Sequence, residues 1–272
     1  MDRFWQSRNV LVTGAAGFAG YHVAIKLQQL GANVRAFVRE QGKGRELPNG
    51  IDVFRGDLTK AEDCNRACVG VDTIFHVAGV FRNLKGGRAE MQAVHVGATE
   101  SFIRAAREHN CRRYVHTSTA GVHGHVEHGP GDENSPFSPG DVYQETKVEG
   151  ERLALSLGEE LGVRVSIVRP CAIYGSGDTR FLKIVRPVKK GLFIMLGSGE
   201  MHYHFVHVDD LVQGYLLAGE NDEAVGEAFL IGGDESPTLN ELVALIARIV
   251  GAKPPRWHIP VWPVYYAGWA CE

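Results

Sequence analysis

The run from Val10 to Gly20 constrains the fold of this chain more than any other segment, because it joins an apolar strand to a helix through three glycines. In such a strand–turn–helix unit, Gly14 permits a tight turn, Gly17 admits a pyrophosphate close to the backbone, and Gly20 lets helix and strand pack closely. The free N–H groups and the positive end of the helix dipole then face the anion. The segment therefore predicts a dinucleotide site.

Short β-rich runs alternate with amphipathic helical runs from Asn9 onward, which is typical of a parallel sheet with helices on both faces. From about Ser176 the alternation fades into a segment punctuated by Gly and Pro. We therefore predict an α/β fold with a Rossmann-type doubly wound, mainly parallel sheet and a small C-terminal substrate lobe. The predicted strands are 9–13, 33–38, 51–55, 73–77, 113–117, 164–168 and 228–231, and the predicted helices are 21–30, 60–69, 89–108, 142–158 and 239–250.

The same pattern divides the chain into two parts. Residues 1–175 would form the dinucleotide-binding domain, including the helix that carries Tyr143. Residues 176–272 would form most of the substrate lobe, with a helix and a strand at about 205–232 returning to the main domain. Asp209 and Asp210 precede an apolar helical run and are predicted to cap it.

Composition and charge exclude several classes of protein. The 272 residues are 44% hydrophobic, enough for a sizeable core, and a net charge of −3 without a basic stripe excludes nucleic acid as a partner. Five scattered cysteines predict reduced thiols. The N-terminus is unlike a signal peptide, which predicts a cytoplasmic protein. No stretch reaches roughly 18 apolar residues, so no integral membrane span is predicted. The apolar run Ile259–Ala270 suggests a lid, an oligomer contact or a membrane-surface element.

Tyr143 and Lys147 lie four residues apart in a predicted helix, so their side chains share one face. A tyrosine ordinarily ionises near pH ~10, and a cation within about 4–6 Å favours the phenolate. This pair is therefore a candidate centre for proton transfer near neutral pH.

Charged residues follow the second predicted strand, where an acidic residue would usually accept a hydrogen bond from the adenosine ribose of NAD. Arg39 occupies this place, with Lys43 and Arg45 close by, which favours the 2′-phosphate of NADP. Glu40 keeps NAD open as the alternative, because it follows Arg39 immediately.

Over nearly its whole length the chain resembles the extended short-chain dehydrogenase/reductase family. The matching motifs are Thr13-Gly14-x-x-Gly17-Phe18-x-Gly20, Gly56-Asp57-Leu58, Phe75-His76-Val77-Ala78-Gly79, Thr117-Ser118-Thr119, the Tyr143/Lys147 helix, Arg169-Pro170-Cys171-Ala172-Ile173-Tyr174-Gly175 and Phe205-Val206-His207-Val208-Asp209-Asp210-Leu211. The resemblance implies that Tyr143 is the acid/base and that Lys147 holds the nicotinamide ribose. It further implies cofactor contacts from Gly14, Ala16, Gly17, Phe18, Gly20, Arg39, Asp57, Leu58, Val77, Ala78, Gly79, Pro170 and Ile173, and substrate contacts from Val80, His123 and Tyr174.

The resemblance also implies a hydroxyl donor to the substrate oxygen at the end of the fifth predicted strand. Counting back from Gly124, which matches a glycine of the family, places Thr119 in this role. Ser118 is the alternative, because the family usually carries serine here and adjacent strand residues face opposite ways. Homodimers are frequent in the family, so a homodimer is an expectation by analogy.

The chain departs from the family pattern at two positions, and its other motifs indicate one branch of the family. His95 stands where an asparagine is common, and Ala172 stands where many nucleotide-sugar enzymes carry an asparagine that contacts the diphosphate. The runs 169–175 and 205–217 look more like the 3β-hydroxysteroid dehydrogenase and dihydroflavonol reductase branch. This implies hydride transfer between NADP, or NAD, and a hydroxyl or keto group of a small apolar molecule that is sterol-, flavonoid- or terpenoid-like.

Two other functions remain open. One is a nucleotide-sugar 4-epimerase or dehydratase that uses tightly bound NAD, and the other is a cofactor-sensing protein without turnover.

Several histidines lie close together in the sequence, but no carboxylate or cysteine completes a familiar metal-ligand spacing, so no metal site is predicted. His123 and His125 are instead interpreted as lining the substrate mouth. Residues 127–139 are rich in Gly, Pro, Asp and Ser and are expected to form a mobile cover.

Overall fold

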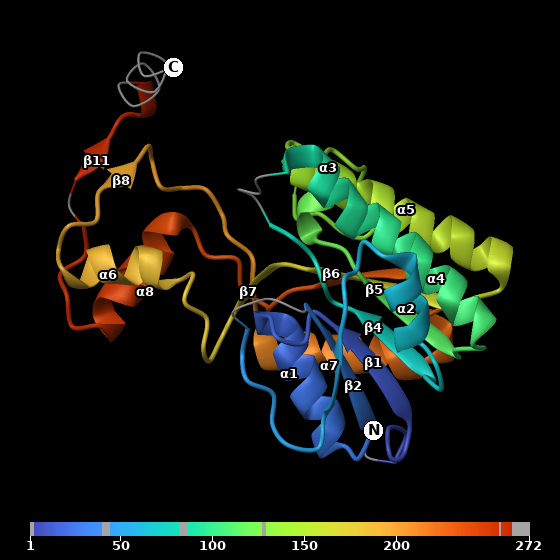
Figure 1. Ribbon diagram of the computed structural model, residues 1–272. Coiled ribbons are helices and arrows are strands. Elements are labelled where there is room, and N and C mark those ends of the chain that lie inside the picture. Colours follow the sequence, from blue (N-terminus) through green and yellow to red (C-terminus); the bar gives the residue numbers. More distant parts are fainter. Residues whose placement is uncertain (1–2, 40–43, 82–85, 127–128, 256, 263–272) are drawn as a thin grey trace. The chain divides into compact units, whose positions relative to one another are not determined.

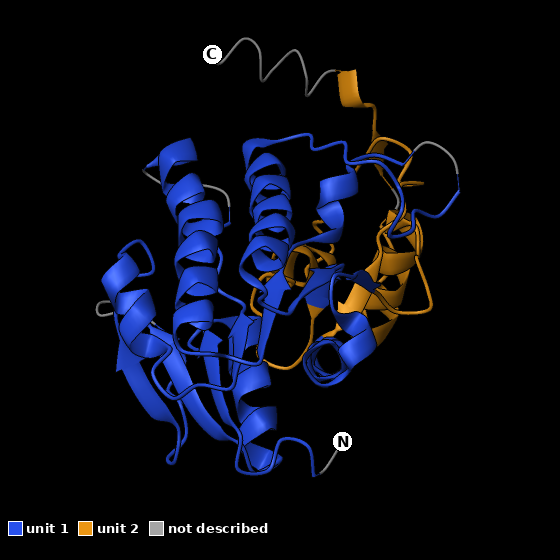
Figure 2. Ribbon diagram, turned by 90° about the vertical axis from the view of Figure 1, so that its right-hand side faces the viewer, with its two compact units in different colours: residues 1–173, 208–231 blue, residues 174–207, 232–272 orange. Residues whose placement is uncertain are grey.

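The computed structural model describes residues 3–39, 44–81, 86–126, 129–255 and 257–262. The chain forms two compact units, drawn in different colours in Figure 2. Unit 1 consists of Met1–Ile173 and Val208–Ile231, and unit 2 consists of Tyr174–His207 and Gly232–Glu272.

Among the described residues, unit 1 contains a seven-stranded sheet in the order β10-β6-β5-β4-β1-β2-β3 (Figure 1). Every pair of neighbouring strands is parallel, which confirms the predicted fold class. The order reverses between β1 and β4, the point at which ligands bind outside the carboxyl ends of such a sheet. The strands are β1 (Asn9–Thr13), β2 (Asn33–Val38), β3 (Asp52–Arg55), β4 (Thr73–His76), β5 (Arg113–Thr117), β6 (Val165–Pro170) and β10 (Ala228–Ile231).

Helices cover both faces of this sheet (Figure 1). Helices α1 (Phe18–Gln29) and α7 (Val208–Glu220) pack against each other on one face. On the other face, α4 (Ala98–Glu108) packs between α2 (Ala61–Ala67) and α5 (Val142–Leu161). The central strand β1 is buried from Val10 to Thr13, so Val10–Val12 read as a continuous apolar run rather than as an alternating one.

Two predictions about helices differ from the structure. The predicted helix 89–108 is interrupted, because α3 (Gly87–Gln92) passes through a π-helical turn, η1 (Ala93–Gly97), before α4 begins. The prediction that Asp209 and Asp210 cap a helix is wrong, since α7 already begins at Val208 and both carboxylates lie in its first turn. There they still face the positive end of the helix dipole.

Cys64, Cys68 and Cys111 are free and buried in the core of unit 1, and Cys171 is free and half-buried. Two short 3₁₀ helices complete this unit, η2 (Ala120–His123) and η3 (Asp222–Ala224).

Unit 2 is built around two helices, α6 (Leu182–Lys189) and α8 (Leu239–Ile249), which pack together through Val188, Met195 and Val243. Helix α6 was not predicted from the sequence, because Pro187 lies inside it. Helix α8 begins with a capping box between Thr238 and Glu241. The short strands here are β8 (Met195–Leu196), β9 (Phe205–His207) and β11 (His258–Ile259), with β8 paired to β11, while β7 (Ala172–Tyr174) includes the boundary between the units.

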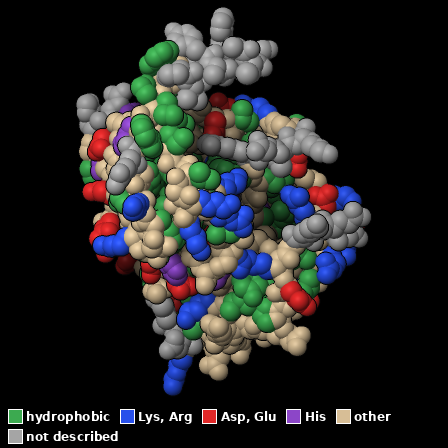
Figure 3. All heavy atoms as spheres, turned by 90° about the vertical axis from the view of Figure 1, so that its left-hand side faces the viewer, with side chains coloured by type: hydrophobic (Ala, Val, Ile, Leu, Met, Phe, Trp, Pro, Cys, Tyr) green, Lys and Arg blue, Asp and Glu red, His purple; other side chains and the backbone are tan. Residues whose placement is uncertain are grey.

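Large apolar side chains are exposed in unit 2, among them Leu192, Leu196, Trp257 and Trp262. Figure 3 shows hydrophobic side chains together with Lys and Arg on the face that it presents. No helix in the described part of the chain is both long enough and apolar enough to cross a bilayer.

Candidate active site

The glycine turn after β1 lies against the end of β4. Gly14 has a φ of +67°, and a Cβ placed on it would be 2.9 Å from the Cα of Ala78. The Thr13 hydroxyl oxygen accepts the Ala78 N–H at 3.0 Å and lies 3.0 Å from Nδ1 of His76. Glycine is therefore needed at position 14 for two reasons, the left-handed backbone and the contact with the next strand's end.

The first turn of α1 suits a pyrophosphate. Gly17 caps the helix without a side-chain hydrogen bond, and no acidic residue stands in the first turn. A Cβ on Gly20 would lie 2.7 Å from the carbonyl carbon of Gly14, so the helix approaches the turn closely. Ala16 and Phe18 flank the turn, with the Ala16 carbonyl accepting the Arg45 N–H at 3.0 Å. A helix N-terminus without a side-chain cap or an acidic residue fits the phosphates of a dinucleotide, because the helix dipole is positive there.

The predicted ribose edge is formed by the ends of β2 and β3. Arg39 is exposed directly after β2, and the Arg45 guanidinium lies 5.2 Å from the centre of the Phe18 ring. The pKa of the Asp57 carboxyl is lowered, first by hydrogen bonds from Thr59 and then by the charges of Lys60 and Arg39. The carboxylate of Asp57 is therefore ionised beside Arg39. Lys43 and Glu40, which bear on the choice between NADP and NAD, lie outside the described residues.

The structure brings together predicted residues from three segments at one small apolar cluster. Tyr143 and Leu58 both pack against the cluster of Val80, Met91 and Val94. The Tyr143 ring also meets the Phe81 ring edge-on, with ring centres 4.9 Å apart. Leu58 was predicted to contact the cofactor, and Val80 was predicted to contact the substrate. Tyr143 was predicted to contact both as the acid/base. These three candidates therefore lie together in one cluster.

Helix α5 holds Tyr143 in its first turn. Asp141 caps the helix by accepting the Gln144 N–H at 2.8 Å. The helix ends at Leu161, and Gly162 caps it in the left-handed conformation.

Lys147 lies one turn further along α5 and is only 4% exposed. Its ammonium donates a hydrogen bond to the Thr117 carbonyl oxygen at the end of β5. Burial lowers the pKa of Lys147 to about 8, although the negative charge of Glu151 opposes this shift. The ammonium can therefore change its protonation state close to neutral pH.

Three buried histidines surround this ammonium. Burial, followed by the charge of Lys147, lowers the pKa of His76 to about 3 and that of His95 to about 3. The same two causes lower the pKa of His116, whose ring nitrogens are both buried and have no hydrogen-bond partner among the described residues. These rings are neutral at physiological pH, so Lys147 is the only cation in this group of four side chains.

The two candidate hydroxyls after β5 have different surroundings. The Ser118 Oγ is buried and has no hydrogen-bond partner in the part of the chain that the structure describes. Thr119 is half-buried, and its Oγ1 accepts the Gly121 N–H at 3.3 Å, which caps η2. This bond uses an acceptor site of Thr119 and leaves its proton available for donation. Next to it, the Gln144 amide lies 3.1 Å from a Cβ placed on Gly121, so the loop meets the first turn of α5.

A buried ion pair that sequence analysis did not identify joins α5 to the end of β6. Nε of Arg169 donates to both carboxylate oxygens of Glu151, at 3.1 and 3.2 Å. The relative exposures of the two side chains are 5% and 1%. The only signal in the sequence is the four-residue spacing of Lys147 and Glu151, which predicts a shared helix face.

Arg169 also fixes the segment before α5. Its Nη1 donates to the Glu133 carbonyl oxygen at 2.9 Å and to Nε2 of His123 at 3.2 Å. Because Nε2 accepts, Nδ1 of His123 carries the proton, and it donates to the Pro136 carbonyl oxygen at 3.4 Å. The Glu133 carboxylate accepts the Leu230 N–H at 2.9 Å. The expected mobility of this cover stays a prediction, while hydrogen bonds tie its residues Glu133 and Pro136 to the rest of unit 1.

The remaining predicted residues are placed as follows. His123 is buried within the Arg169 network, and His125 is exposed. Pro170 ends β6 opposite Ile231. Tyr174 belongs to unit 2, where its ring centre lies 5.2 Å from that of His207 and 6.2 Å from those of Phe181 and Phe205. Val77 and Ile173 are half-buried, Ala78 is buried, and Gly79 is exposed.

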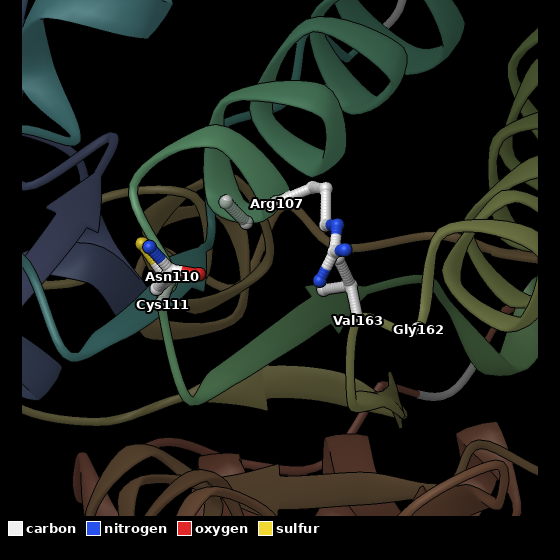
Figure 4. Close-up of a pocket in the computed structure, with 6 residues that line it drawn as sticks. Arg107, Asn110, Cys111, Gly162 and Val163 are labelled. Carbon is white, nitrogen blue, oxygen red and sulfur yellow. The ribbon is translucent and has the colours of Figure 1, made fainter.

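A cavity of about 150 Å³ lies elsewhere in unit 1 (Figure 4). It is lined by Ala106, Arg107, Asn110, Cys111, Gly162 and Val163, at the ends of α4 and α5. These residues precede β5 and β6, so the cavity is at the amino ends of the strands, whereas the candidate site is at their carboxyl ends. Within the described ranges, no three His, Cys, Asp or Glu side chains come together as metal ligands do.

The parallel sheet, its reversal between β1 and β4, and the uncapped glycine turn define a dinucleotide-binding protein of the Rossmann type. The chain belongs to the NAD dependent epimerase/dehydratase family, whose model matches residues 10–232. This confirms the resemblance to the extended short-chain dehydrogenases/reductases, and the protein is an NAD(P)-dependent enzyme of that type.

Comparison with individual proteins supports this assignment. The chain is 32% identical to a 3 beta-hydroxysteroid dehydrogenase/Delta 5→4-isomerase of Mycobacterium tuberculosis, over 92% of this chain and 71% of that protein. It is 30% identical to a decarboxylating sterol-4-alpha-carboxylate 3-dehydrogenase of Mus musculus, over 96% of this chain and 74% of that protein. Among solved structures, it resembles a dTDP-glucose 4,6-dehydratase of Streptomyces venezuelae with NAD and TYD bound, with a TM-score of 0.80, 26% identity, and coverage of 93% of this chain and 84% of that one.

Proposed function

We propose that the protein is an oxidoreductase that transfers a hydride between a nicotinamide cofactor and a hydroxyl or keto carbon of an apolar, sterol-like molecule. The observation that carries this proposal is the first part of α5, where a buried ammonium lies one turn from a half-buried tyrosine. A bound nicotinamide would supply or accept the hydride. The protein's own side chains then have to bind the substrate, orient it and move one proton.

Tyr143 would move this proton. In the reducing direction its hydroxyl donates a proton to the substrate oxygen, and in the oxidising direction its phenolate accepts one. Lys147 would stabilise the phenolate, because an ammonium held close to it in a buried site attracts the negative charge strongly. The Thr117 carbonyl fixes the position of that ammonium.

The hydroxyl of Thr119 would donate a hydrogen bond to the same substrate oxygen. Its half-buried position and its available proton support this choice over Ser118, whose hydroxyl is buried. Ser118 remains the alternative donor. Val80 would contact the substrate, since it packs in the cluster that also receives Tyr143.

The cofactor would be held by the turn from Gly14 to Gly20, with Arg39 near the ribose of its adenosine. We propose a preference for NADP over NAD, because an exposed arginine at this edge can pair with a 2′-phosphate. Isothermal calorimetry with each cofactor tests this preference directly. A larger dissociation constant for NADP than for NAD would contradict it.

An apolar substrate is supported by the names of two relatives, which act on steroids or sterols. The test is a panel of 3β-hydroxysterols and 3-ketosteroids, followed by the near-ultraviolet absorbance of the reduced cofactor. We expect turnover with at least one of these compounds and none with nucleoside-diphosphate sugars.

A nucleotide-sugar epimerase or dehydratase is the second candidate, favoured by the structural likeness to an enzyme solved with NAD and TYD. Ala172 argues against it, since its methyl group offers no hydrogen bond to a diphosphate. The two candidates differ in how the cofactor is held. Stoichiometric NAD released from the purified, denatured protein would favour the second candidate.

A further inference from the structure

The π-helical turn between α3 and α4 brings its backbone against α5. A Cβ placed on Gly150 would lie only 2.5 Å from the carbonyl oxygen of His95, so the two segments touch at this glycine. π-helical turns are rare and are found frequently at functional sites. This one carries the His95 side chain into the space beside Tyr143, where the ring centres are 5.5 Å apart in an edge-to-face arrangement.

Both ring nitrogens of His95 are engaged, and their partners fix which of them carries the proton. Nε2 lies 3.2 Å from the backbone nitrogen of Val80, which can only donate, so Nε2 accepts. Nδ1 therefore bears the hydrogen and donates it to Oγ1 of Thr146, 2.9 Å away. Burial lowers the pKa of His95 to about 3, so this neutral tautomer persists across the physiological range.

Thr146 links His95 to the backbone next to Tyr143, the proposed acid/base. Its hydroxyl lies 3.0 Å from the carbonyl oxygens of both Val142 and Tyr143, and it donates to one of them. Thr146 and His95 are both fully buried, so neither has water as an alternative partner. One imidazole thus links the loop after β4 to the first turn of α5.

We propose that His95 is a positioning residue that holds the Val80 loop and the Tyr143 turn in register. This inference rests on the proposed function, in which Tyr143 moves the proton and Val80 contacts the substrate. His95 does not itself touch the reacting atoms. Its two hydrogen bonds, to Val80 and Thr146, hold the loop after β4 at a fixed distance from the helix turn that carries Tyr143.

The test replaces His95 by Phe, which keeps a planar ring but leaves the Val80 N–H and the Thr146 oxygen without their partner. We expect kcat to fall by roughly 10- to 100-fold, because small displacements of a catalytic group cost about that much. The dissociation constant of the cofactor should change by less than about twofold, since the hydrogen bonds of His95 among the described residues go to Val80 and Thr146 and not to the glycine turn. The Val80 amide should exchange its hydrogen at least about tenfold faster.

Two further variants separate positioning from general loss of stability. His109→Phe removes a histidine that hydrogen-bonds Asn65 at the other end of α4, and it should leave kcat unchanged. Thr146→Val breaks the same connection from the α5 side, so the double variant with His95→Phe should lose little more kcat than either single variant. Additive losses in the double variant, or an unchanged kcat in His95→Phe, would overturn the proposal.

The exchange of the Val80 amide also separates this inference from the proposed function. If the wild-type protein turns over no member of the sterol panel, the proposed function fails, and the exchange alone then decides the role of His95. Slow exchange in the wild type and fast exchange in His95→Phe support it. Equal exchange in the two proteins contradicts it.

Discussion

The glycine turn and the Tyr143 helix lie at the same edge of one sheet, yet they are built by different physical means. The turn depends mainly on backbone geometry: a left-handed Gly14, a close approach at Gly20 and a helix end without a side-chain cap. The helix depends on side chains from distant segments, which bury Lys147 and pair Glu151 with Arg169. Consecutive residues determine the local backbone geometry of the turn. The burial and pairing of the charged side chains depend on residues that only the tertiary fold brings together.

Removing one partner of the buried ion pair should have the largest effect on stability. Glu151→Leu leaves the Arg169 guanidinium buried without its carboxylate, and we expect a loss of about 3–5 kcal/mol in the free energy of unfolding, measured in urea. The double variant Glu151→Leu with Arg169→Met should recover part of this loss. A loss below about 1 kcal/mol in the single variant would show that the pair is not what holds this region.

The charge on Lys147 should make stability depend on pH. The unfolded chain keeps this proton up to its ordinary pKa of 10.5, whereas the folded protein releases it near pH 8, so the unfolded state binds more protons between these values. The free energy of unfolding of the wild type should therefore rise, relative to that of Lys147→Met, by about 3 kcal/mol from pH 8 to 10.5. Parallel pH curves for the two proteins would mean that Lys147 is not held in a desolvated site.

A substitution in the glycine turn should weaken cofactor binding. Gly20→Ala puts a methyl group against the Gly14 carbonyl, so α1 and the turn must separate. We expect the cofactor to bind at least about tenfold more weakly, or about 1.4 kcal/mol, by calorimetry. Gly70→Ala is the control for adding a methyl group to a glycine, since a Cβ there meets nothing within 4 Å, although its φ of +72° costs stability. Equal cofactor affinity in wild type and Gly20→Ala would contradict the assigned role of the turn.

Elements with a local sequence pattern could be predicted, whereas features that depend on distant residues could not. Strands β1, β2, β5 and β10 begin and end where the sequence predicted, because each is a short β-rich run in the alternation of strands and helices that a parallel α/β sheet requires. Short elements of unit 2 were missed, since the two-residue strands β8 and β11 carry too little pattern to detect.

Within the site, the order of motifs predicted the residues that meet around Val80, but not the buried network that supports them. Glu151 and Arg169 lie 18 positions apart in different kinds of element, so no periodicity connects them. The π-helical turn at His95 was equally hidden, because its sequence continues the apolar spacing of an ordinary helix.

The smallest expected effect concerns the choice of cofactor. Arg39 is exposed, so its charge is screened, and Arg39→Ala should weaken NADP binding by about tenfold while leaving NAD binding nearly unchanged. Calorimetry at two salt concentrations should show the difference shrinking as salt rises. An equal loss for both cofactors would place Arg39 on the shared part of the molecule instead of at the 2′-phosphate.

The central claim is that Tyr143, with the buried Lys147 beside it, is the proton-transfer centre. Turnover of Tyr143→Phe with an accepted substrate, measured together with its cofactor affinity, tests this claim most directly. We predict a fall in kcat of roughly 10²- to 10⁴-fold, because phenylalanine keeps the ring but has no proton to exchange, with cofactor affinity unchanged. Unchanged turnover together with intact cofactor binding would contradict the claim.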